Sequence, residues 1–189
     1  DKRDLALPES QQRLLQTVVE TGVPFVLCMM AGSAMDLNLA SESAAAILQT
    51  FYPGARGGKA IAEILFGAAA PFGKLPITLY RSVADLPDFT DYHMAGRTYR
   101  FLKAQPLYPF GYGLNYGDAQ VTAAQADPAS YQALTQHGTT LMVQLENRGQ
   151  RPAEEVLQVY VRVLGSENEV PHPKLAAFRR VTLAPGAQI

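Results

Sequence analysis

The first eighty residues alternate between helix-like and strand-like hydrophobic patterns. Residues 7–21 place the apolar side chains of Leu14, Leu15, Val18 and Val19 at helical spacing, which predicts an amphipathic helix. Residues 24–30 and 44–52 are continuous apolar runs, which are typical of strands covered on both faces of a sheet. This alternation favours a layered α/β domain.

A second helix and a third strand continue the pattern. Ile61, Ile64 and Leu65 fall on one helical face of residues 59–67, and Gly67 suits the position just beyond a helix end. Residues 71–80 predict a short strand. Three strands are few for a parallel sheet, so we expect the front half of this domain, in a longer protein, to precede Asp1.

Residues 81–116 have no sustained period and are crowded with aromatic residues, proline and glycine. A long irregular stretch inside a folded protein is usually a functional loop or an ordered strap between domains. Because so many aromatic rings are costly to leave in water, the sequence favours a strap packed against a partner.

After Asp118 the pattern becomes all-β. Residues 139–149 alternate apolar and polar side chains, and residues 154–164 and 174–186 repeat this pattern less regularly. Short strands between turn signals predict part of an Ig-like sandwich, which needs about seven strands. The fold class expected for the chain is therefore an incomplete α/β sandwich followed by an incomplete all-β sandwich.

Composition removes several function classes. Hydrophobic residues make up 48% of the 189 residues and charged residues 17%, which fits a packed core. Sixteen basic residues oppose seventeen acidic ones, so charge indicates neither a nucleic acid nor an anionic membrane as partner. No apolar run is long enough to span a bilayer. The single cysteine, Cys28, is expected to be a buried structural thiol.

Few side chains suggest catalysis or metal binding. His93, His137 and His172 are far apart and lack metal-ligand spacing, and Ser33 lacks a nucleophile-elbow pattern. The glycine-rich turn at residues 52–58 lacks the pattern of a phosphate-binding loop, so we expect a structural turn in which Gly57 and Gly58 allow the start of the following helix to pack closely on the sheet.

Charged residues of the strap leave alternatives open. Asp85, Asp88 and Asp91 lie among aromatic residues, where a carboxylate can contact a sugar or can form local capping and turn bonds. Arg97 and Arg100 can clamp a carboxylate or stack on aromatic rings, and a structural ion-pair role is the simpler interpretation.

Taken together and in order, several segments resemble glycoside hydrolase family 3, the β-glucosidases and β-xylosidases. The matching segments are residues 1–11, 24–37, 44–67, 71–89, 91–101 and 106–116. Residues 143–162 and 171–186 are similar to the fibronectin type III-like domain that follows in many members. The resemblance implies three segments: 1–88 as the second half of the α/β sandwich domain, 89–117 as an aromatic interdomain strap, and 118–189 as a partial fibronectin type III-like domain.

The resemblance also implies a retaining, exo-acting hydrolase without cofactor or metal, which is secreted or periplasmic. Its substrates would be oligosaccharides or aryl and alkyl β-glycosides, glucosides or xylosides, bound mainly by an amino-terminal TIM-type barrel. The aspartate nucleophile would lie in that barrel and the glutamate acid/base just upstream of Asp1, so no catalytic residue is assigned here. Asp1 and Arg3 match positions beyond the acid/base loop and are expected to anchor it.

The strap is the expected contact with the barrel. Arg97, Tyr99 and Arg100 combine arginine with an aromatic ring, a composition that dominates many interfaces, and are the docking candidates. The alternative is a non-catalytic scaffold, or a carbohydrate-binding or interaction module.

Overall fold

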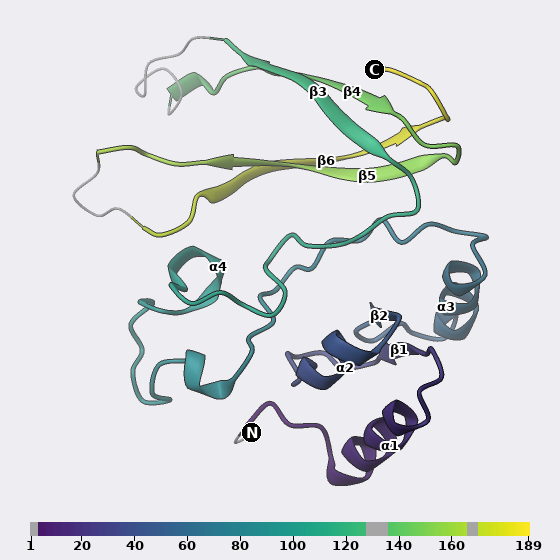
Figure 1. The fold of residues 1–189 in the computed structure, drawn as a ribbon. Coiled ribbons are helices and arrows are strands. Elements are labelled where there is room, and N and C mark those ends of the chain that lie inside the picture. The colour runs from purple at the N-terminus through teal and green to yellow at the C-terminus, as the bar shows by residue number, and fades with distance from the viewer. Residues whose placement is uncertain (1–3, 128–135, 166–169) are drawn as a thin grey trace. The chain divides into compact units, whose positions relative to one another are not determined.

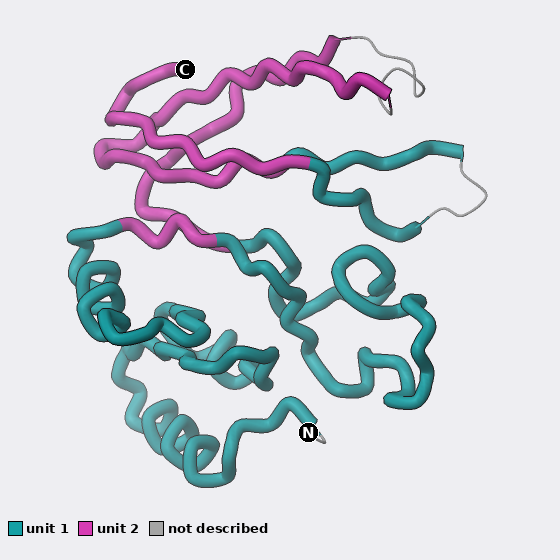
Figure 2. Tube along the Cα trace, turned by 180° about the vertical axis from the view of Figure 1, so that it is seen from behind, with its two compact units in different colours: residues 1–69, 74–112, 159–176 teal, residues 70–73, 113–158, 177–189 magenta. Residues whose placement is uncertain are grey.

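The structure is a computed structural model that describes residues 4–127, 136–165 and 170–189 (Figure 1). The chain divides into two compact units (Figure 2). Unit 1 comprises residues 1–69, 74–112 and 159–176, and unit 2 comprises residues 70–73, 113–158 and 177–189. These two units do not coincide with the three segments expected from the sequence. The boundaries at residues 88 and 117 therefore remain a prediction.

Unit 1 begins with the α/β alternation that the hydrophobic pattern predicts. Its first elements are α1 (Glu9–Glu20), β1 (Val26–Met29), α2 (Asn38–Ser43), β2 (Ala46–Gln49) and α3 (Gly57–Leu65). The strands β1 and β2 are parallel, with Val26 opposite Ala46 and Met29 opposite Gln49. Both apolar runs are therefore strands, and the mixed α/β character is confirmed.

The core of unit 1 is apolar. Leu37 is 1% exposed, and Ala40, on the short helix α2, is fully buried. The buried members of this cluster are Leu7, Leu15, Met29, Met35, Leu37, Ala40 and Leu79. Helix α1 contributes Leu15 to this core, whereas Leu14 is 65% exposed, so its predicted place on the apolar face is wrong. The adjacent residue points about 100° away around the helix, and the apolar stripe is narrower than the sequence suggests.

The strand predicted at residues 71–80 is wrong. This segment forms only an isolated antiparallel bridge between Leu79 and Tyr108, although the Leu75 amide also donates to the Tyr112 carbonyl at 2.8 Å. The physical reason is proline: Pro71 and Pro76 lack the amide proton that a continuous ladder needs. The segment nevertheless lies beside the strap residues that follow it.

The glycine turn before α3 is tight at one glycine, where the contact lies within the turn and not with the sheet, and open at the other. A side chain at Gly57 would meet the Pro53 ring at 2.6 Å, so this close approach requires glycine. Gly58 has open space around it, so close packing at Gly58 is wrong. Gly67 has a φ of +75° just past the helix end, in agreement with its predicted capping position.

The second half of the chain contributes four strands. They are β3 (Ala119–Ala126), β4 (Leu141–Asn147), β5 (Ala153–Val161) and β6 (Lys174–Leu183). Strands β3 and β4 are antiparallel, and β5 pairs with β6 in a separate two-stranded sheet. The predicted strands in residues 139–149, 154–164 and 174–186 are therefore present.

In unit 2, the carboxy-terminal residues extend the β3–β4 sheet. Leu145 and Ile189 exchange backbone hydrogen bonds of 2.9 and 3.0 Å, and the Asn147 amide donates to the Ala187 carbonyl. The segment at residues 186–189 therefore lies along the second edge of β4, opposite β3.

Candidate functional site

The sequence points to the strap as the candidate site, and the structure describes all of it. Asp1 and Arg3, the expected anchors of an acid/base loop, lie outside the described residues. Their role stays a prediction. A 3-10 helix, η1 (Val83–Asp85), precedes the strap, and the strap itself contains a single helical turn, α4 (Thr98–Phe101).

Arg97 braces the loop at residues 88–97 from within. Its Nε donates to the His93 carbonyl at 3.1 Å, and its Nη2 donates to the carbonyls of Asp88 and Asp91. One guanidinium thus holds three backbone oxygens of the same loop. The docking role predicted for Arg97 stays a prediction, since these contacts are all internal.

The strap carboxylates form the local bonds that were one of the two alternatives. Asp85 accepts from the Ser82 amide in a capping box. Asp88 accepts from the Thr90 amide at 2.8 Å and from its hydroxyl at 2.6 Å, and these bonds lower the pKa of Asp88. Asp91 accepts from the amide and ring of His93, which lowers the pKa of Asp91. Both exposed groups stay ionised at neutral pH.

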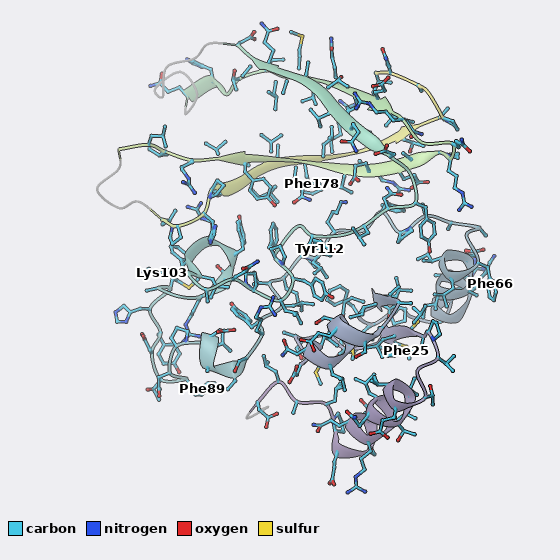
Figure 3. All side chains as sticks on the ribbon, in the orientation of Figure 1. Phe25, Phe66, Phe89, Lys103, Tyr112 and Phe178 are labelled. Carbon is cyan, nitrogen blue, oxygen red and sulfur yellow. The ribbon has the colours of Figure 1, made fainter. Side chains whose placement is uncertain are left out.

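Two aromatic rings project from this braced loop. Phe89 is 82% exposed and Tyr92 is 88% exposed, and Figure 3 labels Phe89. The hydrogen bonds that order the loop use backbone, carboxylate and guanidinium groups and none from these rings. The loop therefore holds two aromatic side chains outward without packing them against its own backbone network.

Tyr99 occupies a different environment, at the centre of an aromatic cluster within unit 1. Its ring stacks on Phe110 with centroids 4.2 Å apart, and Tyr160 approaches it edge-on at 6.4 Å. The Tyr99 hydroxyl accepts a 3.0 Å hydrogen bond from the Leu175 amide. Burial raises the pKa of Tyr160, and Tyr99 adds to this shift.

Arg100 and His172 join the same two segments. Arg100 Nη1 donates to the His172 carbonyl at 2.6 Å, and His172 Nε2 lies 2.8 Å from the Leu102 carbonyl. Because a carbonyl only accepts, Nε2 carries the proton in this contact. Sequence reasoning missed this role of His172, and no local signal indicates it, since the partner is seventy residues away in the chain.

The structure also bears on the metal ligands, the cysteine and the membrane spans considered from the sequence. Within the described ranges, no group of three or more His, Cys, Asp or Glu residues could hold a metal ion. Cys28 is half-buried on β1, so the expected full burial is wrong. None of the described helices is long and apolar enough to cross a membrane.

Comparisons with known proteins agree with this architecture. The chain is 36% identical to a xylan 1,4-β-xylosidase of Xylanibacter ruminicola over 98% of its length, which is 21% of that protein. It is 34% identical to a periplasmic β-glucosidase of Salmonella typhimurium, again over 98% of the chain and 26% of the relative. The chain thus spans about a quarter of the length of these relatives.

Solved structures show the same fold. A β-glucosidase from Erythrobacter marinus matches all of the chain and 25% of its own, with a TM-score of 0.82 and 34% identity. A β-D-glucoside glucohydrolase from Trichoderma reesei matches with a TM-score of 0.85 at 23% identity, over all of the chain and 30% of its own. Residues 1–116 match the model of the glycosyl hydrolase family 3 C-terminal domain. This chain therefore belongs to glycosyl hydrolase family 3.

Proposed function

We propose that this chain is the carboxy-terminal part of an exo-acting, retaining β-glycosidase that hydrolyses β-glucosides or β-xylosides. The observation that carries the proposal is the family match over residues 1–116. Relatives named β-xylosidase and β-glucosidase support it, and the periplasmic relative supports a secreted or periplasmic location.

The chain contributes structure to this activity and not the reacting carboxylates. A retaining mechanism needs a nucleophile and an acid/base about 5 Å apart. From the family resemblance we expect both upstream of Asp1, with the nucleophile in an amino-terminal barrel. Asp1 and Arg3 would then hold the acid/base loop from this side.

Release of p-nitrophenol from the β-xyloside and the β-glucoside tests this proposal. The 189-residue chain alone should not accelerate hydrolysis of either substrate. The longer protein, which adds the residues upstream of Asp1, should turn over at least one of them. The proposal would be contradicted if the short chain turned over either substrate and lost this activity when one of its own carboxylates was replaced. An inactive longer protein would instead favour the scaffold or carbohydrate-binding alternative.

We also infer that the four strands of residues 119–183 are part of a fibronectin type III-like domain following a strap at residues 89–117. The antiparallel β3–β4 pair and the separate β5–β6 sheet support a two-sheet sandwich. Shortened chains that end at residue 88 or at residue 117 test the boundaries, since a cut at a true domain boundary leaves the preceding part folded.

The strap is the proposed contact with the catalytic barrel. The outward rings of Phe89 and Tyr92 support this, because exposed aromatic rings on an ordered loop are typical of interface anchors. Among the three docking candidates, Tyr99 and Arg100 hold segments of unit 1 together, so they would act by keeping the loop in place.

Alanine substitution in the longer protein separates these contributions. Tyr92→Ala should lower the melting temperature of the longer protein and leave the short chain unchanged, whereas Tyr99→Ala should destabilise both. Tyr52→Ala is the matched control, since Tyr52 is equally exposed but lies outside the strap. Equal effects of Tyr92→Ala and Tyr52→Ala would count against docking through the strap.

A further inference from the structure

Thr98 has an unusual backbone conformation at the point where the loop at residues 88–97 meets α4 (Figure 1). Its φ is +57°, and Thr98 and Phe51 are the two non-glycine residues with positive φ in the described part of the chain. Positive φ is uncommon for any side chain and a genuine outlier for a β-branched one such as threonine, because Cβ crowds the backbone. Such a conformation persists only where the surrounding groups hold it.

Hydrogen bonds hold Thr98 from both sides. The Thr98 amide donates to the Tyr80 hydroxyl at 2.9 Å, and the Thr98 carbonyl accepts from the Leu102 amide at 3.0 Å. The Thr98 hydroxyl accepts a longer bond of 3.3 Å from the Arg100 amide. The bonds to Leu102 and Arg100 belong to α4 and the residue that follows it, whereas the bond to Tyr80 ties Thr98 to another segment of unit 1.

The backbone that carries Tyr80 is anchored in the core. The preceding residue, Leu79, is 2% exposed and belongs to the apolar cluster of unit 1. Leu79 also exchanges backbone hydrogen bonds with Tyr108, of 2.9 Å from the Leu79 amide and 3.2 Å from the Tyr108 amide. The Tyr80 hydroxyl therefore connects Thr98 to a fixed part of the unit.

Arg97 links the conformation of Thr98 to the loop at residues 88–97. Arg97 directly precedes Thr98, and its guanidinium holds three backbone carbonyls of that loop. A change of φ at Thr98 rotates the chain on the amino-terminal side of this residue. It would therefore turn Arg97 and, with it, the loop that this side chain braces.

We propose that Tyr80 is a positioning residue whose hydroxyl holds Thr98 at positive φ and thereby fixes the direction in which the loop at residues 88–97 presents its two outward rings. Without the hydroxyl, Thr98 relaxes to the negative φ that threonine prefers, and the loop turns with it. The consequence for docking rests on the proposed contact with the barrel, whereas the positioning itself is a property of unit 1 and can be measured without the barrel.

Tyr80→Phe removes the hydroxyl and keeps the ring. In the 189-residue chain it should speed hydrogen exchange of the Thr90, His93 and Arg97 amides about two- to tenfold, the factor that corresponds to one net hydrogen bond. It should also weaken the nuclear Overhauser effect between the amide and Cα protons of Thr98, which is strong at positive φ because the two protons are then close together. A bond with a purely local role would change exchange at the Thr98 amide alone.

Thr98→Gly provides the rescue, because glycine adopts positive φ about as readily as negative φ. Combined with Tyr80→Phe, it should return exchange at the three loop amides to the rates of the unmodified chain, although the amide at position 98 still lacks its acceptor. Tyr112→Phe is the matched control. It removes a hydroxyl from another tyrosine of the strap, whose ring stacks on Tyr108, and should leave exchange in the loop unchanged.

The longer protein separates this proposal from docking through the strap. Tyr80→Phe should lower the melting temperature of the longer protein by more than that of the short chain, and adding Thr98→Gly should remove the difference. If loop exchange responds in the short chain as expected while the longer protein shows no additional loss, the positioning is supported and docking through the strap is contradicted.

Thr98→Pro decides the matter even if Tyr80→Phe fails to fold. Proline holds φ near about −65° and has no amide proton, so it forbids both the positive φ and the bond to Tyr80. The extended backbone of Arg97 already suits the residue before a proline. Thr98→Pro should therefore speed exchange at the loop amides at least as much as Tyr80→Phe does. Unchanged loop exchange in Thr98→Pro, a Tyr80→Phe effect confined to the Thr98 amide, or a double variant that Thr98→Gly does not restore would overturn the proposal.

Discussion

The two units differ in what their buried centres are made of. Unit 1 buries an apolar cluster around Leu37, whereas the described part of unit 2 buries few apolar side chains and encloses Asn147, which is 0% exposed. Asn147 Nδ2 faces the carbonyls of Arg151, Leu183 and Ala184, and its Oδ1 accepts from the Gly149 amide. The described part of unit 2 thus combines a buried, hydrogen-bonded amide with three buried apolar residues, Leu145, Ala153 and Leu183, so the two units should fail by different physical routes.

The largest expected effect is loss of apolar packing in unit 1. Leu37→Ala removes a side chain that is 1% exposed and leaves a cavity, which should cost about 2–5 kcal/mol. Hydrogen exchange of individual amides is the appropriate measurement, because a melting curve of a two-unit chain does not report one unit. Protection should fall in β1 and β2 and persist in β3 and β4.

Leu14→Ala is the matched control for that variant. Leu14 is exposed on α1, so its truncation should change protection in β1 by less than about 0.5 kcal/mol. If Leu37→Ala lowered protection equally in β4, the two units would not be energetically separate.

Loss of the polar centre of unit 2 ranks second. Asn147→Ala leaves buried carbonyls and the Gly149 amide without a partner and should destabilise unit 2 by about 2–3 kcal/mol. Hydrogen exchange in β4 and at residues 186–189 reports the effect. Asn115→Ala, at a half-buried site, should cost less; a larger loss there would show that Asn147 is not the centre of unit 2.

The two units also differ in how much of their structure the sequence predicts. Continuous apolar runs predict β1 and β2 as strands, although the burial on both faces that such runs suggest is absent: Met29 is the one buried residue of the two strands. Helix α2 is missed, since its six residues bury only Ala40. Alternation in β4 puts Asn147 on the face of Leu141, Val143 and Leu145, yet a polar residue at a strand end reads as the start of a turn. Its burial depends on carbonyls more than thirty residues away.

The strap shows the same limit for the candidate site. Composition predicts an aromatic segment, but it does not distinguish Tyr99, which packs inside unit 1, from Tyr92, which projects outward. Arg97 carries no sequence signal for its bonds to backbone carbonyls, because those oxygens converge only when the loop is folded. Side-chain partners set by distant segments are therefore the part that sequence leaves undetermined.

A smaller effect separates two adjacent glycines at the start of α3. Gly57→Ala would press a methyl group against the Pro53 ring and should destabilise unit 1 by about 1–3 kcal/mol. Gly58→Ala meets open space in a helix and should stabilise it by about 0.5–1 kcal/mol. Hydrogen exchange in α3 measures both variants. Stabilisation by Gly57→Ala would mean that the turn at residues 52–58 can move, and that the contact with Pro53 does not constrain it.

The smallest expected effect is the acid response of the loop at residues 88–97. The pKa of Asp91 is lowered by its bonds to His93, so the folded loop favours the ionised carboxylate. Its stabilisation is present above the ordinary aspartate pKa of 3.8 and is lost as pH falls through the lower value in the folded loop. The His93 amide shift should therefore change below pH 3.8. Asp91→Asn keeps an oxygen acceptor without the charge, so its His93 shift should be flat in this range. If the His93 amide shift still titrated in Asp91→Asn, the response would belong to another group. Asp88 would be the first candidate, because it lies in the same loop and its pKa is also lowered.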